Sequence, residues 1–281
     1  CRSWKLLVML PFPPYRFGNP AAMAPGFIGP LDAYSANLPL ALSVTNRLLS
    51  SYTGYAFNVL RSTDSTSQDI GFNADGTVNT TALLAFCGAG NGTITKIYNQ
   101  GSGGSALDAA QSLAANQPRI VNAGVLDDGT YFNANHWLDV ASQSAATYTD
   151  GTNVQVALVA KMNDANNRIF DFADQISCWL PFGGSIYWDA PLATGRISVA
   201  RPAGLPSSYK VTSLERAGGT STIRYDGSVL TSGGVSGTMA ATSVLRIGAT
   251  NSGTGLSIGN LRTLVLWKDC TNAATRAAAL P

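Results

Sequence analysis

The sequence predicts an all-β fold, a sandwich or jelly roll built from short strands. From residue 118 onward, short apolar runs recur at intervals of about 8–14 residues, with turn residues between them, as in sandwiches and jelly rolls. Gly accounts for 29 of the 281 residues, which suits tight turns between such strands. Charged residues make up only 12% of the chain, against a usual value of about 25%.

Residues 31–117 are expected to contain a mixture of short helices and strands, unlike the mainly β remainder. Apolar residues between 41 and 49 recur at helical spacing, so a short helix is predicted there. Strands are predicted over 56–60 and 93–98, and a helix over 80–86, capped by Asn79 or Thr80. A last short helix is predicted over 272–280. The predicted organisation is an arm (1–30) and a sandwich domain (31–281), whose core is 118–281.

Composition and charge exclude several classes of protein. A hydrophobic share of 45% excludes general disorder. The net charge is only +2 and the basic residues are scattered, so no nucleic-acid partner is expected. No apolar run approaches the roughly 20 residues that a membrane-spanning helix needs.

The four cysteines are far apart in the sequence, at Cys1, Cys87, Cys178 and Cys270, and His136 is the only histidine. With no CxxC pair, a zinc site has almost no ligands. Isolated buried thiols are expected, with one long-range disulfide as the alternative.

Residues 1–30 contain six prolines with aromatic residues between them. Proline at this density disfavours a long helix or a central strand, so an extended arm is predicted. The arm would pack either on its own domain or on a neighbouring subunit. The side chains expected to carry an assembly contact are aromatic: Trp4, Phe12, Tyr15 and Phe17.

Several segments together carry a family resemblance. Residues 47–54 (RLLSSYTG), 86–88 (FCG) and 94–100 (ITKIYNQ) resemble, at matching spacing, the opening of the catalytic domain of arabinofuranosidase B. A similar opening occurs in bacteriophage virion proteins with a concanavalin-like domain, which also share a run similar to 180–189 (LPFGGSIYWD). Residues 260–267 look laminin-G-like. The resemblance implies a concanavalin-like jelly-roll sandwich with a few short helices.

Departures from the enzyme pattern predict that the chain is not catalytic. In the family this chain resembles, the nucleophilic Glu precedes a strand similar to 186–188, where this chain has Gly183 and Gly184. The family's paired adjacent cysteines are missing, since Trp179 follows Cys178, and the Asp of its YDQS segment is Asn99. We therefore expect no catalytic residues.

One alternative pair of carboxylates stays open at this point. Retaining glycosidases need two carboxyl groups about 5 Å apart across the sugar. Asp189 and Glu215, the only glutamate, could form such a pair.

Carbohydrate binding is the predicted activity of the sandwich. Such sites stack an aromatic ring against the C–H face of a sugar and surround it with polar groups. Residues of the required types near the central strands are Trp137, Trp179, Tyr187, Trp188 and Asp189. Trp137 and Trp188 are also candidates for the core, whereas strand alternation places Tyr187 and Asp189 together on the exposed face.

No cofactor is expected, although Ca²⁺ is considered at acidic loop residues. Asp127, Asp128 and Asp164 could supply oxygen ligands, as in some laminin-G domains. Solvated loop carboxylates are the alternative.

Taken together, the sequence predicts a non-catalytic bacteriophage virion protein, namely a capsid decoration, fibre or tail component. Its predicted partners are other virion proteins through the arm, cell-surface glycans and further copies of itself. Its predicted location is the virion or the extracellular space. The alternative is a secreted glycoside hydrolase or carbohydrate-binding module related to arabinofuranosidase B.

Overall fold

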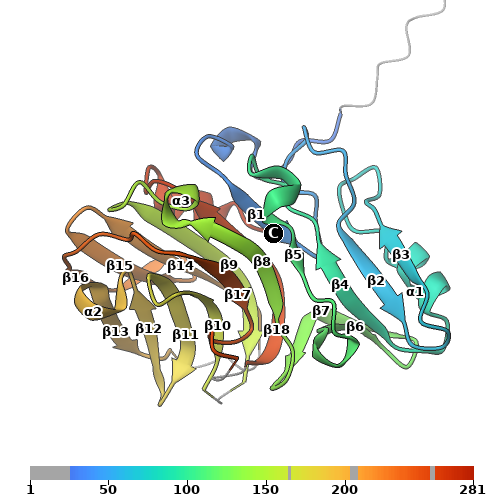
Figure 1. Cartoon of the computed structure of the whole chain (residues 1–281). Helices are drawn as coiled ribbons and strands as arrows, with labels where there is room; N and C mark the ends of the chain where they lie inside the picture. The colour runs from blue at the N-terminus through green and yellow to red at the C-terminus, as the bar shows by residue number, and fades with distance from the viewer. Residues whose placement is uncertain (1–25, 164–165, 203–207, 254–256) are drawn as a thin grey trace, which may run out of the picture.

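The computed structural model describes residues 26–163, 166–202, 208–253 and 257–281. The predicted assembly residues Trp4, Phe12, Tyr15 and Phe17 lie outside the described residues, as do Cys1 and Asp164. Within the described part, the chain forms an antiparallel β-sandwich with short helices at its margins (Figure 1). This confirms the predicted all-β class.

The first layer has the spatial order β16-β15-β14-β9-β18, and β18 pairs along its far edge with both β1 and β7. All of these pairings are antiparallel. The bounds of these strands are β1 (Leu40–Ser43), β7 (Val125–Asn133), β9 (Val154–Met162), β14 (Lys210–Ala217), β15 (Thr220–Tyr225), β16 (Ser228–Gly234) and β18 (Ile258–Trp267).

The second layer has the spatial order β13-β12-β11-β10-β17-β8-β5, again antiparallel throughout. Neighbouring strands come from distant parts of the sequence, as β17 lies between β10 and β8. The bounds are β5 (Ala109–Ala110), β8 (Leu138–Ser144), β10 (Arg168–Phe172), β11 (Ile176–Phe182), β12 (Ser185–Asp189), β13 (Arg196–Ala200) and β17 (Thr242–Ile247).

Four further strands lie at one end of the molecule, and two of them, β4 and β6, connect the two layers. Strand β4 pairs with β5 of the second layer, and also with β6, which pairs with β7 of the first. The sheet is therefore continuous from one layer to the other (Figure 1). The bounds are β2 (Phe57–Arg61), β3 (Ser67–Ile70), β4 (Gly92–Ile97) and β6 (Arg119–Asn122).

Helices are short and lie at the edges of the sheet. The α-helices within the described residues are α1 (Thr80–Cys87), α2 (Leu192–Gly195) and α3 (Ala273–Ala278). Single 3₁₀ turns occur at Asp32–Tyr34, Gly104–Leu107, Ala114–Asn116 and Ala145–Thr147. None of the described helices is both long and apolar enough to cross a membrane.

The main core fills the space between the layers and includes residues of both the 31–117 and the 118–281 parts. Phe57 and Ile94 of the former belong to the same buried cluster as Phe170 and Trp188 of the latter. Trp188 also joins the layers by a hydrogen bond, because its Nε1 donates to the backbone oxygen of Glu215 on β14 at 3.0 Å.

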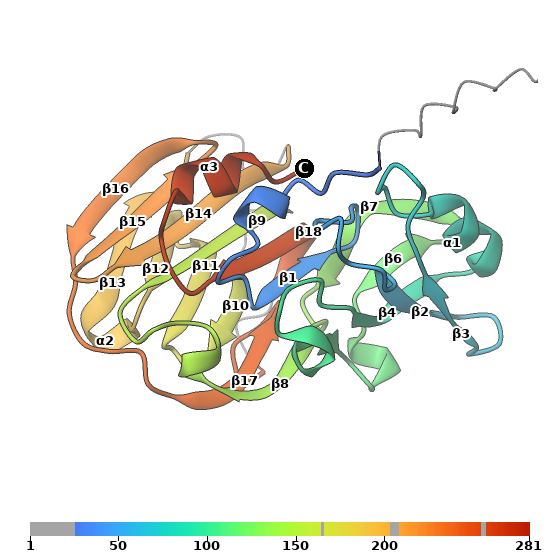
Figure 2. The ribbon, with the colours of Figure 1, turned by 90° about the horizontal axis from the view of Figure 1, so that it is seen from above.

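A second, smaller core covers the outer face of the first layer. Val265 and Trp267 point outward from β18 and pack under Leu31 and Leu48, together with Ala277 of α3. Seen from above, the chain before β1 and the helix α3 lie across β9 and β18 (Figure 2). The part of the first layer's outer face formed by β9 and β18 is consequently buried.

The prediction of a helix over residues 41–49 is wrong, because the chain there forms the end of β1 and then a loop. Leu40 and Leu42 enter the main core, whereas Ala41 enters the second core. A strand buried on both faces loses the polar–apolar alternation that identifies strands in a sequence.

Other local predictions are confirmed. Helix α1 begins after Asn79, whose Oδ1 accepts a hydrogen bond from the amide of Ala82 at 2.9 Å, as an N-cap residue does. Helix α3 lies in the segment predicted to be helical. The described cysteines are free thiols, with Cys87 and Cys178 buried, and burial raises the pKa of both.

The buried amide of Asn99 holds the chain before β1 against the end of β4. Its Oδ1 accepts from the amides of Ala41 (2.8 Å) and Gly101 (3.0 Å). Its Nδ2 donates to the carbonyl of Pro39 at 2.8 Å and to that of Gly104 at 3.2 Å. A carboxylate could accept from the two amides, but it could not donate to the two carbonyls.

Replacing Asn99 should therefore destabilise the fold. We expect Asn99→Ala to lower the free energy of unfolding by about 1–3 kcal/mol, because two buried hydrogen bonds, to Ala41 and Pro39, and two partly buried ones are lost. Asn99→Asp should also destabilise. Urea denaturation measures both, with the exposed Asn133→Ala as control, expected within about 0.5 kcal/mol of the parent. Equal stability of Asn99→Ala and the control would contradict this role.

Candidate functional site

A row of polar side chains crosses the outer face of the second layer. Strand register places them opposite one another on neighbouring strands: Asp139 (β8), Arg246 (β17), Asp171 (β10), Ser177 (β11), Asp189 (β12) and Arg196 (β13). Their neighbours along each strand, such as Leu138, Phe170 and Trp188, fill the main core. Because side chains alternate between the faces of a strand, the whole row points away from the core.

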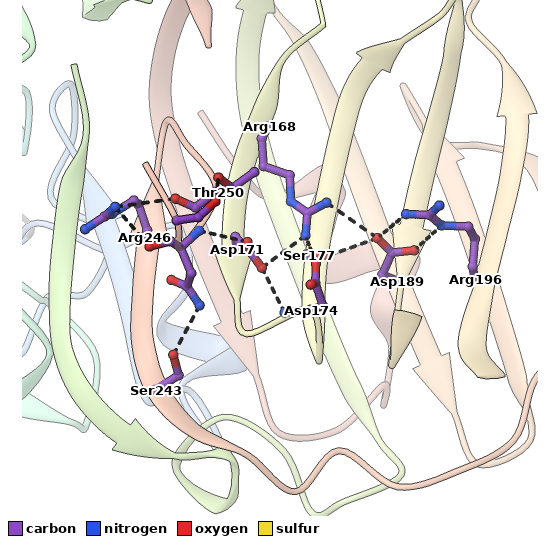
Figure 3. A network of polar contacts seen from close by, with 11 residues as sticks. Arg168, Asp171, Asp174, Ser177, Asp189, Arg196, Ser243, Arg246 and Thr250 are labelled. Carbon is purple, nitrogen blue, oxygen red and sulfur yellow. Dashed lines mark hydrogen bonds and ion pairs between the residues drawn. The ribbon is translucent and has the colours of Figure 1, made fainter. Parts of the chain in front are cut away.

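Asp189 is the most buried carboxylate of this row, with 0% exposure. Arg196 holds it with two hydrogen bonds, from Nε to Oδ1 at 2.6 Å and from a terminal nitrogen to Oδ2 at 2.9 Å. Ser177 donates to Oδ2 at 3.0 Å, and a terminal nitrogen of Arg168 lies 3.9 Å from it (Figure 3). The expectation that Asp189 is exposed is wrong, because these partners cover it.

Arg168 is a buried cation at the centre of the row. It pairs with Asp171 at 3.0 Å and with the carboxylate of Asp174 (Figure 3). The other oxygen of Asp171 accepts from the amide of Asn251 at 2.9 Å. Both oxygens of Asp171 therefore have a partner, one in Arg168 of the same strand and the other in the loop that follows β17.

At the β8 end of the row, Arg246 and Asp139 form a third ion pair. The Nε of Arg246 donates to Oδ1 of Asp139 at 2.7 Å, and a terminal nitrogen donates to Oδ2 at 2.9 Å. Another terminal nitrogen of Arg246 donates to the carbonyl of Asn251 at 3.2 Å.

Aromatic rings lie beside the row on the same face. Trp179 and Tyr187 are paired on β11 and β12, and each is stacked by a guanidinium group. The Cζ of Arg168 lies 5.0 Å from the ring centre of Trp179, and that of Arg196 lies 5.1 Å from the ring centre of Tyr187. Phe182 completes the group, with its ring centre 4.7 Å from that of Trp179.

These five side chains line a hollow of about 240 Å³. Phe182 is 42% exposed at its margin. The sequence prediction named Trp179 and Tyr187 but missed Phe182 and both arginines. The pairing of β11 with β12 shifts its register between Trp179 and Phe182. Simple alternation along β11 therefore does not place Phe182 on this face.

Three predicted residues do not line the hollow, namely Trp188, Trp137 and Asp189, the last of which is buried beneath Arg196. Trp188 is fully buried in the main core, so its expected place in a carbohydrate site is corrected. Trp137 precedes β8 on the outer side, where the Cζ of Arg246 lies 5.0 Å from its ring centre. The outer face of the second layer therefore brings together Trp137, Trp179, Tyr187 and Asp189.

Comparison with known families relates this architecture to glycoside hydrolases. The family described as alpha-L-arabinofuranosidase B, catalytic, matches residues 30–171, which is half of the chain. The chain belongs to this family. The match begins before β1 and ends in β10, so it contains the connecting strands and part of the candidate site.

Solved structures share the fold of this arabinofuranosidase B family member. A GH54 arabinofuranosidase soaked with a cyclic sulfate inhibitor is 16% identical, with a TM-score of 0.67. An arabinofuranosidase complexed with arabinofuranosyl-alpha-1,2-xylobiose is 17% identical, with a TM-score of 0.68. Each alignment covers 90% of this chain and 65% of the other. Comparison with curated protein sequences found no match.

The alternative catalytic pair, Asp189 with Glu215, does not form in this family member. Trp188 and Leu214 both enter the main core, so Asp189 and Glu215 point away from it on different layers. Glu215 instead accepts hydrogen bonds from Ser213 and Arg224, each at 2.9 Å. The two carboxylates therefore lie on opposite outer faces and cannot flank one sugar.

Gly183 and Gly184, where the sequence resemblance leads us to expect the family's nucleophile position, lie in the turn between β11 and β12. Gly183 and Gly184 adopt φ values of 54° and 80° there, a conformation that favours glycine. This turn supplies backbone geometry and no carboxylate.

The acidic residues considered for Ca²⁺ are predicted in a loop, but the two that the structure describes, Asp127 and Asp128, lie in strand β7 and form ion pairs. Asp127 binds Arg119 at 2.6 Å, and Asp128 pairs with Arg262 and Lys161. Among the residues that the structure describes, no three His, Cys, Asp or Glu side chains gather in a group that could hold a metal ion. The paired carboxylates do not fit a calcium site.

The pair of Arg196 and Asp189 should be strongly coupled. We expect Arg196→Ala to lower the free energy of unfolding by about 3 kcal/mol, because it leaves a buried carboxylate without its main partner. Asp189→Asn combined with Arg196→Ala should recover most of that loss. A double-mutant cycle by urea denaturation measures this coupling.

The exposed pair of Lys210 and Asp226 is the matched control. Lys210→Ala should cost less than about 1 kcal/mol. Additive effects of Arg196→Ala and Asp189→Asn would contradict the coupling.

Proposed function

We propose that this chain binds a neutral carbohydrate in the hollow lined by Arg168, Trp179, Phe182, Tyr187 and Arg196, and does not cleave it. The single observation that carries the proposal is three aromatic rings gathered beside a row of paired charges. The family match and the arabinofuranosidase structures support a glycan that contains arabinofuranose as the ligand class.

The chemistry of the hollow suits a sugar. Aromatic faces pack against sugar C–H groups, and a few fixed polar groups orient the hydroxyls. Here the stacked arginines hold the rings of Trp179 and Tyr187, and the remaining N–H groups of the half-exposed Arg196 can donate to hydroxyl oxygens. The rings are thus held in place before a ligand binds, which reduces the entropy lost on binding.

Charge balance favours a neutral ligand. Two guanidinium groups, on Arg168 and Arg196, face the three carboxylates of Asp171, Asp174 and Asp189. The guanidinium groups are already paired with these carboxylates, so an acidic sugar would have to compete for them. A neutral sugar can bind without displacing these carboxylates from the guanidinium groups.

Binding without cleavage is proposed because the carboxylates of the site have structural partners. A retaining mechanism needs a nucleophile and an acid about 5 Å apart, each free to approach the sugar. Asp189 is buried beneath Arg196 and Ser177, and Asp171 is held by Arg168 and a backbone amide.

Removal of the central ring tests the binding proposal. Trp179→Ala should weaken binding of arabinofuranosyl-xylobiose at least about tenfold, since the ring provides the sugar-packing surface. Isothermal titration calorimetry measures this. Leu113→Ala, which removes an exposed apolar side chain elsewhere, should leave the affinity unchanged. Equal affinity of Trp179→Ala and the parent protein would refute the site.

Hydrolysis is the second candidate, favoured by the match to a catalytic family. An aryl α-L-arabinofuranoside tests it directly. We expect no turnover by the parent protein. Turnover that Asp189→Asn abolishes would overturn the proposal of binding without cleavage.

A location in the virion remains a separate proposal, with residues 1–30 as the anchoring arm of an oligomeric extracellular component. Its support is the proline and aromatic pattern of that segment. The end of the arm lies on its own domain, where the Cζ of Arg47 is 4.0 Å from the ring centre of Phe27.

Deletion of residues 1–25 tests the anchoring role. The shortened chain should keep its thermal unfolding temperature but should no longer enter assembled particles, because Trp4, Phe12, Tyr15 and Phe17 are lost. Sedimentation of particles with labelled protein measures incorporation. Incorporation equal to that of the full chain would contradict the role of the arm.

A further inference from the structure

One structural unit, an ion pair with its guanidinium stacked on an aromatic ring, occurs three times on the outer face of the second layer. The three units are Asp189–Arg196–Tyr187, Asp171–Arg168–Trp179 and Asp139–Arg246–Trp137. The closest charged atoms lie 2.6, 3.0 and 2.7 Å apart, and the stacking distances are 5.1, 5.0 and 5.0 Å. Two of these units form the hollow, whereas the third lies outside it.

Strand register places the third ring on the same side of the polar row as the other two. Tyr187 and Trp137 each precede the row residue of their strand by two positions, and Trp179 follows Ser177 by two. Because neighbouring strands are antiparallel, these offsets all point toward the same end of the sheet. The three rings therefore follow one line across the strands.

The line of rings has a definite length. Strands β8, β17, β10, β11 and β12 are consecutive neighbours in this layer, which makes four spacings between Trp137 and Tyr187. At the usual separation of strands this amounts to about 19 Å. A single sugar cannot span that distance, whereas an oligosaccharide can.

We propose that Trp137, together with Arg246 and Asp139, forms a second binding position, and that a linear neutral glycan runs between it and the hollow, over the Thr250–Asn251 segment whose backbone is bound to Arg246 of β17 and Asp171 of β10. This inference rests on the proposed function. It adds that the ligand is a chain of several sugars, not a single sugar or a disaccharide.

The composition of this face favours a glycan over other partners. Each of the three units is internally neutral, so the line lacks the excess of positive charge that a nucleic acid requires. The rings are separated by polar side chains and do not form the contiguous apolar patch expected at a protein interface. Separate rings beside hydrogen-bonding groups match the repeat of a sugar chain.

Dependence of affinity on chain length tests the inference. The probes are arabino- and xylo-oligosaccharides from the disaccharide to the hexasaccharide, titrated calorimetrically into the full chain. For the parent protein we expect the hexasaccharide of the recognised series to bind at least about tenfold more tightly than the disaccharide. Trp137→Ala should remove this gain and leave disaccharide affinity unchanged, which also shows that the variant is folded.

Trp179→Ala is the matched comparison, since it should weaken the short and the long ligands alike. Equal affinity of the parent for disaccharide and hexasaccharide would overturn the second position and leave the hollow intact as a site. The same holds if Trp137→Ala retains the gain, or if it weakens both ligands equally. Absence of binding by every probe would instead overturn the proposed function and this inference with it.

Discussion

Burial of the Asp189 carboxylate is the constraint on which the candidate site depends. A fully buried charge is tolerated only when it is paired and hydrogen-bonded, and Arg196, Ser177 and Arg168 meet that need from three neighbouring strands. The same arginines then lie over Tyr187 and Trp179. Satisfying one buried charge therefore fixes the positions of the rings that would contact a ligand.

The outer faces of the two layers differ in how far other segments cover them, and this difference determines where a binding site can form. Strands β9 and β18 of the first layer are covered by the chain before β1 and by α3, which bury Val265 and Trp267. The second layer instead carries ion pairs, drawn in Figure 3, and aromatic rings stacked by their arginines on its outer face. Membership of the arabinofuranosidase B catalytic family is compatible with either binding or hydrolysis, because a scaffold can keep its strands while its carboxylates take structural roles.

The sequence correctly predicted the β-strand architecture and part of the candidate site. The predictions that were wrong have physical causes. The alternation over 185–189 correctly separated Tyr187 from Trp188, since strand side chains point to opposite faces. It could not show that Asp189 is buried, because Arg196 and Arg168 meet it through strand pairing. It also could not place Arg168, which faces outward at a register shift in β10. The mistaken helix at 41–49 arose because β1 is buried on both sides.

Hydrogen–deuterium exchange in the presence of arabinofuranosyl-xylobiose tests the central claim most directly, because it locates the ligand without altering any residue. The proposed site predicts slower amide exchange in β11, β12 and the turn between them, with unchanged exchange in β14 and β15 of the opposite layer. Protection concentrated in β14 and β15 beneath α3, with none in β11 and β12, would contradict the proposed site.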